Sequence, residues 1–129
     1  MKPHEEWLFK AENDYESAKY LLTSPKPLFD IAAYHTQQCA EKSLKAYLAF
    51  CGQEIDRTHN LKMLAESCAL IDKTFCELID DCILLNPYAT LYRYPEGDLM
   101  PEKSTIVAAL SVSLKIYNYV KAKVLFESK

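Results

Sequence analysis

The chain has 129 residues, of which 50% are hydrophobic, 26% charged and 12% aromatic, with two glycines and six prolines. This length suits one domain over residues 1–129, and the half-apolar composition excludes a disordered chain. Two glycines leave little material for hairpin turns or a glycine-rich phosphate loop. No apolar stretch reaches the roughly 18 residues that a membrane span needs, and residues 1–6 lack the apolar core of a secretory signal. We therefore expect a compact cytoplasmic domain without a membrane partner.

The charge balance excludes bulk electrostatic binding of nucleic acid. The formal net charge is −3 and the pI is near 5.6, whereas proteins that bind by phosphate neutralisation usually carry a basic patch and a pI above about 9. A local site for RNA remains compatible with these values. The chain has only two arginines, Arg57 and Arg93, so a planar two-point grip on a phosphate must come from one of these positions.

The five cysteines, at positions 39, 51, 68, 76 and 82, form no C-x-x-C pair. A zinc site or a disulfide framework needs closer or more regular spacing. We expect reduced cysteines that fill the core, and neither a metal site nor a bound cofactor.

Apolar residues recur at three- and four-residue steps in five segments, which is the spacing of one helix face. The first helix is expected over 5–22 and ends before Pro25 and Pro27. The second is expected over 28–51, with Gly52 at its C-terminal cap. A shorter helix follows over 60–71, capped by Thr58 or Asn60.

Two more helices complete the chain. One is expected over 74–85, with Thr74 as its cap and Pro87 at its end. Residues 93–98 give the longest loop signal, and Pro101 suits the first turn of a last helix over 101–126. Strand alternation is absent. The sequence therefore predicts an all-α fold, an up-and-down four-helix bundle with one additional short helix.

A polar stripe follows the expected second helix at helical spacing. At 100° per residue it points nearly opposite to the apolar face that contains Leu44. Two interpretations are open: a solvated face with a weak i,i+4 ion pair, or a binding surface. The stripe consists of Gln38, Glu41, Lys42 and Lys45.

Four motifs occur in order along nearly the whole chain. Residues 34–48 read Y-H-T-Q-Q-C-A-E-K-S-L-K-A-Y-L, residues 11–22 fit A-x-x-D-x-x-x-A-x-x-L-L, residues 59–64 fit H-x-L-x-x-L, and residues 93–95 are R-Y-P. Together they resemble the HEPN domains, the higher eukaryotes and prokaryotes nucleotide-binding domains, in which Q-Q-x-A-E-K-x-L-K-A-x-L marks the second helix.

The resemblance implies several properties beyond the residue patterns. It implies a four-helix up-and-down bundle with an added short helix, in agreement with the periodicity. It also implies a homodimer and a partner protein, a minimal nucleotidyltransferase encoded beside many such domains in a toxin–antitoxin-like pair.

One departure from the family bears on catalysis. Ribonuclease members of the family carry an arginine followed, after four to six residues, by a histidine. The corresponding positions after Arg57 are 62–64 (Lys, Met, Leu) and those after Arg93 are 98–100 (Asp, Leu, Met). Because no histidine stands there, we expect no catalytic residues of the usual ribonuclease type.

Arg93 is the strongest candidate for a ligand contact, because it lies beside Tyr92 and Tyr94 on a loop that leads to a helix start. A guanidinium, aromatic rings and helix-terminal N–H groups together can hold a phosphate and a base. The alternative is that Arg93 anchors the loop to an acidic partner such as Glu41. His59 likewise allows a structural role at a helix start.

The sequence thus favours a non-catalytic binding module for a nucleotide, an RNA or a partner protein. The candidate contact residues are expected in one shared groove and are Gln38, Lys42, Lys45, His59, Arg93 and Tyr94. One alternative is a metal-independent ribonuclease that uses His35 or His59. A second alternative is a structural homo-oligomer without a ligand.

Overall fold

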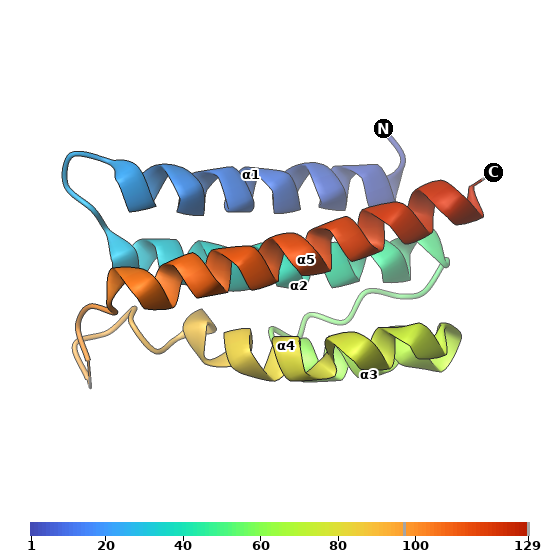
Figure 1. Ribbon diagram of the computed structural model, residues 1–129. Coiled ribbons are helices and arrows are strands. Elements are labelled where there is room, and N and C mark those ends of the chain that lie inside the picture. Colours follow the sequence, from blue (N-terminus) through green and yellow to red (C-terminus); the bar gives the residue numbers. More distant parts are fainter. Residues whose placement is uncertain (97, 129) are drawn as a thin grey trace.

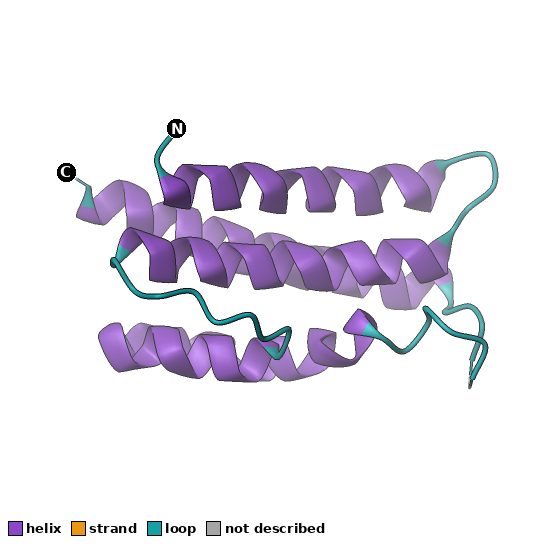
Figure 2. Cartoon of the chain, turned by 180° about the vertical axis from the view of Figure 1, so that it is seen from behind, coloured by secondary structure: helices purple, strands orange, loops and turns teal. Residues whose placement is uncertain are grey.

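The computed structural model describes residues 1–96 and 98–128, and every regular element in them is helical (Figures 1 and 2). This confirms the predicted all-α class. The predicted 93–98 loop includes Gly97, which lies outside the described residues. The elements are α1 (Pro3–Thr23), α2 (Phe29–Phe50), α3 (Leu61–Ile71), the 3-10 helix η1 (Lys73–Leu78), α4 (Ile79–Leu85), the 3-10 helix η2 (Asn86–Ala89) and α5 (Lys103–Glu127).

The helix ends follow the expected capping chemistry in two places. Gly52 has φ +72°, the left-handed conformation that favours glycine after a helix, and it terminates α2. The side chain of Asn60 accepts a hydrogen bond from the Met63 N–H at 3.2 Å and caps α3. Of the two expected candidates for this cap, the helix start therefore uses Asn60.

The expected helix over 74–85 is divided into two parts. Its first residues form η1 and only the second part, α4, is an α-helix. The cap of η1 is Asp72 rather than Thr74, since the Asp72 carboxylate accepts the Thr74 N–H at 3.0 Å. The expected last helix also starts later, because α5 begins at Lys103 and not at Pro101.

Three long helices, α1, α2 and α5, run side by side, and the shorter α3 and α4 form a layer along them (Figures 1 and 2). Helix α2 is the central element, because it contacts α1, α3, α4 and α5. The main core gathers around Leu44 and Tyr47 of α2, together with Leu64, Phe75 and Val120 from the surrounding elements. Most side chains of α2 are therefore buried against a neighbouring element, although Ile31 is 41% exposed.

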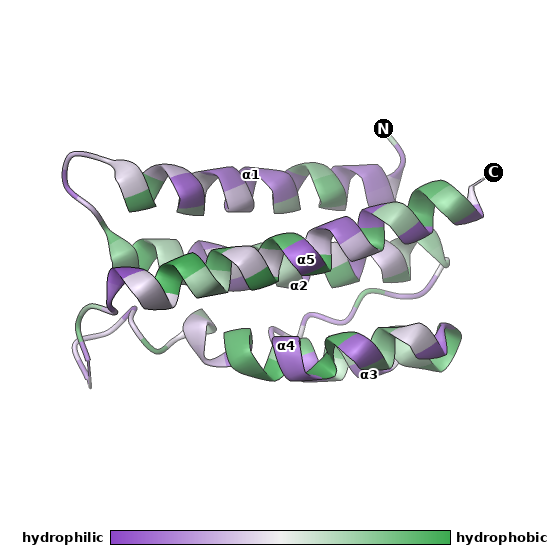
Figure 3. Ribbon diagram, in the orientation of Figure 1, coloured by the Kyte–Doolittle hydropathy of each residue, from purple (hydrophilic) through white to green (hydrophobic). Residues whose placement is uncertain are grey.

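Apolar surface remains at the C-terminal end of α5, whose last turns are hydrophobic in Figure 3. Leu125 and Phe126 are 56% and 80% exposed there. Within residues 1–96 and 98–128, none of the helices combines the length and the apolar character needed to cross a bilayer.

Candidate functional site

The polar stripe of α2 is buried, which contradicts its interpretation as a solvated face. Gln38, Glu41 and Lys45 are 8%, 3% and 5% exposed. Side chains from both sides bond into the stripe, Asp14 from α1 and His59 from the segment before α3. Because α2 is covered by neighbours on several sides, most of its polar residues are enclosed together with its apolar ones, and Lys42 is the most exposed of the stripe.

The Glu41 carboxylate forms one of two centres in this stripe. Its Oε1 lies 2.8 Å from His59 Nδ1, and its Oε2 accepts Lys45 Nζ at 3.1 Å. Gln37 Nε2 donates to the His59 carbonyl oxygen at 3.0 Å, and Gln38 Nε2 donates to Gln37 Oε1 at 2.8 Å. These bonds satisfy the buried carboxylate and fix the segment that carries His59.

The Asp14 carboxylate forms the second centre, with the same three kinds of group. His35 Nδ1 lies 2.8 Å from one of its oxygens, and Lys42 Nζ lies 2.7 Å from the other. The side chains of His35 and Lys42 are 27% and 25% exposed, whereas in the Glu41 centre Lys45 is 6% and His59 69% exposed. Each centre joins one carboxylate to one imidazole and one ammonium group.

We call the two centres together the α2 polar belt, since both lie along α2. In both histidines the carboxylate engages Nδ1, so Nε2 is the ring nitrogen left for an external group. A carboxylate that orients an imidazole in this way is a common device in acid–base and binding sites. The belt consists of Asp14, His35, Gln37, Gln38, Glu41, Lys42, Lys45 and His59.

Arg93 lies beyond one end of the belt and does not pair with Glu41, contrary to the expected alternative. Its guanidinium carbon is 4.5 Å from the centre of the Tyr34 ring and 5.8 Å from that of Tyr94. The guanidinium donates a long hydrogen bond, 3.5 Å, to the Ala89 carbonyl oxygen. Among the residues that the structure describes, no carboxylate forms an ion pair with Arg93, and its fork of N–H donors faces solvent.

The six candidate residues therefore occupy three places rather than one groove. Gln38, Lys45 and His59 meet around Glu41, Lys42 belongs to the Asp14 centre, and Arg93 and Tyr94 lie at Tyr34. The main residues missed as site members are Asp14 and Tyr34, although Asp14 stands in the A-x-x-D motif of the first helix. Tyr34 lies at helical spacing from Gln38, Glu41 and Lys45, on the same helix face. Its place next to the stripe could therefore have been predicted from the sequence.

A cleft of about 570 Å³ adjoins the belt at His35. It lies along α1, whose exposed Tyr20 borders it. It is a broad hollow, largely open to solvent, rather than an enclosed cavity. The lining residues are Asn13, Glu16, Ser17, Tyr20, Leu21 and His35.

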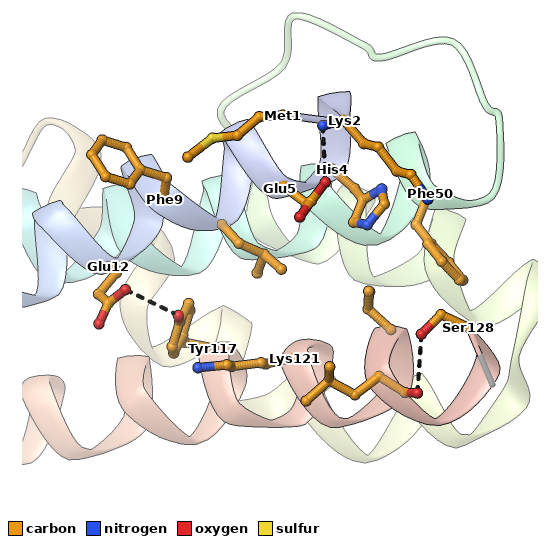
Figure 4. Close-up of a pocket in the computed structure, with 13 residues that line it drawn as sticks. Met1, Lys2, His4, Glu5, Phe9, Glu12, Phe50, Tyr117, Lys121 and Ser128 are labelled. Atoms are coloured by element: carbon orange, nitrogen blue, oxygen red, sulfur yellow. Dashed lines mark hydrogen bonds between the residues drawn. The ribbon is translucent and has the colours of Figure 1, made fainter.

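A second hollow, which we call the α1–α5 groove, holds about 500 Å³ between the N-terminal part of α1 and the C-terminal part of α5 (Figure 4). Leu8, Phe50 and Leu125 contribute apolar lining. At one side the Tyr117 hydroxyl donates to Glu12 Oε2 at 3.5 Å and links the two helices. Burial, reinforced by the charge of Glu12, raises the pKa of the Tyr117 phenol.

The described part of the chain has no cluster of metal ligands, and three of its five thiols are buried. Across residues 1–96 and 98–128, no three His, Cys, Asp or Glu side chains converge to hold a metal ion. Burial raises the pKa of Cys39, Cys68 and Cys82 to about 12, so these thiols stay protonated at neutral pH. Cys76 is exposed, which differs from the expected core position.

Comparisons with known proteins identify the family and the fold of the chain. A family model of the HEPN domain matches residues 4–123. The crystal structure of ST0689, described as an archaeal HEPN homologue, is 26% identical with a TM-score of 0.77, over 96% of this chain and 99% of that chain. TT1696 from Thermus thermophilus is 23% identical with a TM-score of 0.78, over 95% and 99% of the two chains, and shows the same fold. No curated protein matches the chain.

Proposed function

The chain belongs to the HEPN domain family, and from this premise we propose that it is a non-catalytic module that binds the phosphate of a nucleotide or RNA at Arg93. We further propose that it works with a minimal nucleotidyltransferase in a toxin–antitoxin-like pair. The binding role is supported by the geometry at Tyr34, and the partnership by the family.

The observation that carries the binding role is the exposed, stacked guanidinium of Arg93. Stacking on Tyr34 at 4.5 Å holds the plane of the guanidinium, and its donors are not consumed by a carboxylate of the described residues. A planar fork that is held in place and free to donate is the arrangement that binds phosphate oxygens in pairs. Tyr94, which is 58% exposed, adds a ring to which a base can stack.

The charge around Arg93 supports an anionic ligand. The α2 polar belt and Arg93 together hold three permanent cations, Lys42, Lys45 and Arg93, against the two carboxylates Asp14 and Glu41. The chain as a whole has a net charge of −3. These five groups sum to a charge of +1, carried by Arg93, which forms no ion pair within the described residues, and the two histidines add positive charge when they are protonated.

The test compares the two arginines of the chain. Binding of a fluorescein-labelled ten-nucleotide single-stranded RNA is followed by fluorescence polarisation at low salt for the wild type, Arg93→Ala and Arg57→Ala. We expect Arg93→Ala to weaken binding on the order of tenfold or more, and the exposed Arg57 to be replaceable within about twofold. Thermal unfolding of both variants should match the wild type.

Two results would contradict this binding role. One is equal RNA affinity for Arg93→Ala and the wild type. The other is lower thermal stability of Arg93→Ala with unchanged binding, which would make Arg93 a structural anchor of its loop.

The partnership needs a separate experiment. The genome neighbourhood is inspected for a nucleotidyltransferase, and the two proteins are co-expressed with a tag on the partner. We expect co-purification of a complex, and a homodimer of this chain by light scattering when it is alone. A homodimer that binds neither RNA nor the transferase would favour the structural oligomer instead.

A second candidate function, a metal-independent ribonuclease, is favoured by the two carboxylate–histidine pairs. Asp14 and Glu41 each hold a histidine through Nδ1 at 2.8 Å, which leaves Nε2 for proton transfer to or from a substrate. His59 is the more accessible, with a side chain that is 69% exposed. Total RNA incubated in chelator with the wild type, His35→Ala and His59→Ala separates this candidate from the binding module. Cleavage that neither change reduces, or no cleavage, removes it.

A further inference from the structure

We propose that the cleft beside His35 holds the base and ribose of a ribonucleotide whose phosphate is bound by Arg93. This inference rests on the proposed function, and it adds the place and the chemistry of the nucleoside. It uses residues of α1 that none of the sequence motifs marks as ligand contacts.

The lining of the cleft suits a nucleoside. The cleft is a broad hollow of about 570 Å³ that is largely open to solvent, so a nucleoside in it would contact one wall. Tyr20 and Leu21 provide apolar contacts, while Asn13 and Ser17 provide groups that both donate and accept hydrogen bonds. A nucleobase combines an apolar face with a polar edge. The apolar lining residues can contact its face, and the polar ones can bond to its edge.

Tyr20 is the expected stacking platform. Its ring is 71% exposed on the solvent-facing side of α1. Stacking on an exposed aromatic ring is a main way in which proteins bind unpaired bases. The ring of Tyr20 is therefore accessible to a planar ligand.

Glu16 indicates which part of the nucleotide enters the cleft. Its carboxylate lines the cleft, so a phosphate there would be repelled. The same carboxylate can accept hydrogen bonds from ribose hydroxyls, and the 2′-hydroxyl is the group that distinguishes RNA from DNA. The cleft therefore fits the neutral nucleoside and favours ribose over deoxyribose.

A continuous line of contacts joins the cleft to Arg93. His35 lines the cleft, and its ring packs edge-on against Tyr34 with 5.7 Å between the centroids. Tyr34 in turn carries the Arg93 guanidinium at 4.5 Å. Asp14 holds His35 Nδ1, so the ring is fixed between the two places. The cleft and the Arg93 guanidinium are thus linked through two contacting rings.

The experiment measures stacking and affinity separately on the full chain. The probe is an RNA trinucleotide with 2-aminopurine at its centre, together with the same trinucleotide carrying a 2′-deoxyribose there. Quenching of 2-aminopurine fluorescence reports stacking, and calorimetry reports affinity. The variants are Tyr20→Ala, Tyr20→Phe, Glu16→Gln and Arg93→Ala, and the control is Phe126→Ala, an aromatic residue of α5 that is 80% exposed.

We expect Tyr20→Ala to abolish quenching and to weaken binding on the order of tenfold, while Tyr20→Phe and Phe126→Ala resemble the wild type. Glu16→Gln should reduce the preference for ribose. The inference is overturned if Tyr20→Ala quenches and binds like the wild type while Arg93→Ala weakens binding, a result that leaves the proposed function intact. It is also overturned if the wild type binds the ten-nucleotide RNA and not the trinucleotide. If the wild type binds neither, the proposed function fails with it.

Discussion

Helix α1 meets its two long neighbours in opposite ways. Toward α2 it contributes Asp14, a buried carboxylate that holds His35 and Lys42 at 2.8 and 2.7 Å. Toward α5 it leaves the α1–α5 groove of about 500 Å³, where apolar side chains such as Leu8 and Leu125 line an open space. Charge is thus enclosed on one side of the helix while apolar surface stays accessible on the other.

The comparison separates two contributions to helix packing. Polar bonds fix one alignment of the helices, whereas burial of apolar area does not. The belt fixes how α1 and the segment before α3 sit against α2, because each of its bonds needs one alignment of the helices. The groove needs no such alignment, and one hydrogen bond at 3.5 Å between Glu12 and Tyr117 links its two sides. Changes in the belt should therefore be costly, and changes in the groove should be tolerated.

The largest effect is expected for Glu41→Ala. This change leaves the Lys45 ammonium, whose side chain is 6% exposed, without its carboxylate. Removing one member of a buried ion pair typically costs about 3–5 kcal/mol. Urea denaturation followed by circular dichroism gives the free energy of unfolding.

The matched control for Glu41 is the double variant Glu41→Leu with Lys45→Met. It removes both charges and keeps similar side-chain volumes, so its stability should lie within about 1 kcal/mol of the wild type or above it. If the double variant loses as much stability as Glu41→Ala, the loss comes from packing and not from an unpaired charge.

Asp14→Asn should have an intermediate effect. The amide keeps the shape of the carboxylate but replaces one acceptor with a donor that faces a cation. Because His35 and Lys42 are about a quarter exposed and can rehydrate, we expect a loss of about 1–3 kcal/mol. Glu16→Gln, on the exposed side of the same helix, should stay within about 0.5 kcal/mol. Equal losses for the two variants in chemical denaturation would remove the distinction between belt and surface.

A partly exposed ion pair, Lys123 with Asp72 at 2.8 Å, gives a smaller and pH-dependent effect. The hydrogen bond from Lys123 lowers the pKa of the Asp72 carboxyl. The contribution is therefore complete above the unfolded pKa of about 3.9, and it is lost as the pH falls through the lowered folded value. Lys123→Met should cost less than about 1 kcal/mol at pH 7, because solvent screens the pair.

The check is the difference in unfolding free energy between the wild type and Lys123→Met from pH 7 to about pH 2. It should shrink toward zero at the acidic end. The control is Lys62→Met, an exposed lysine of α3 without an ion pair in the described part of the chain. A difference that stays constant over this range would show that Asp72 does not stabilise the fold through Lys123.

The smallest effect is expected for Leu125→Ser in the α1–α5 groove. Leu125 is 56% exposed, so the change removes little buried area and should alter stability by no more than about 0.5 kcal/mol. The comparison variant is Leu44→Ala in the core, where a loss of about 2–5 kcal/mol is expected. A large loss for Leu125→Ser in thermal unfolding would mean that the groove is closed in solution.

The helices and the family could be predicted because both depend on local patterns. The run Q-Q-x-A-E-K-x-L-K-A-x-L in residues 37–48 marks the second helix. Gly52 after this helix and Asn60 before the next one are residues typical of helix caps. The division of residues 73–85 into η1 and α4 was missed, since the apolar spacing in this segment fits a continuous helix.

The burial of the belt could not be predicted, because periodicity assigns polar residues to solvent whenever they oppose an apolar face. That rule holds for a helix at the surface. In α2 the polar face is covered by α1 on one side and by residues up to His59 on the other. Partners such as Asp14 and His59 lie 21 and 18 residues away from the groups they bind, and such distant pairing is set by the tertiary fold.

The central position of α2 also sets the order in which parts of the molecule open. Its amides should exchange with deuterium only when the whole bundle unfolds, whereas the last turn of α5 should exchange by fraying. The segment before α3 lies between these limits, since Gln37 holds its His59 carbonyl and Glu41 holds its imidazole. The lifetime of these two bonds, rather than the stability of the bundle, determines how often this segment leaves the Glu41 side chain, which is 4% exposed.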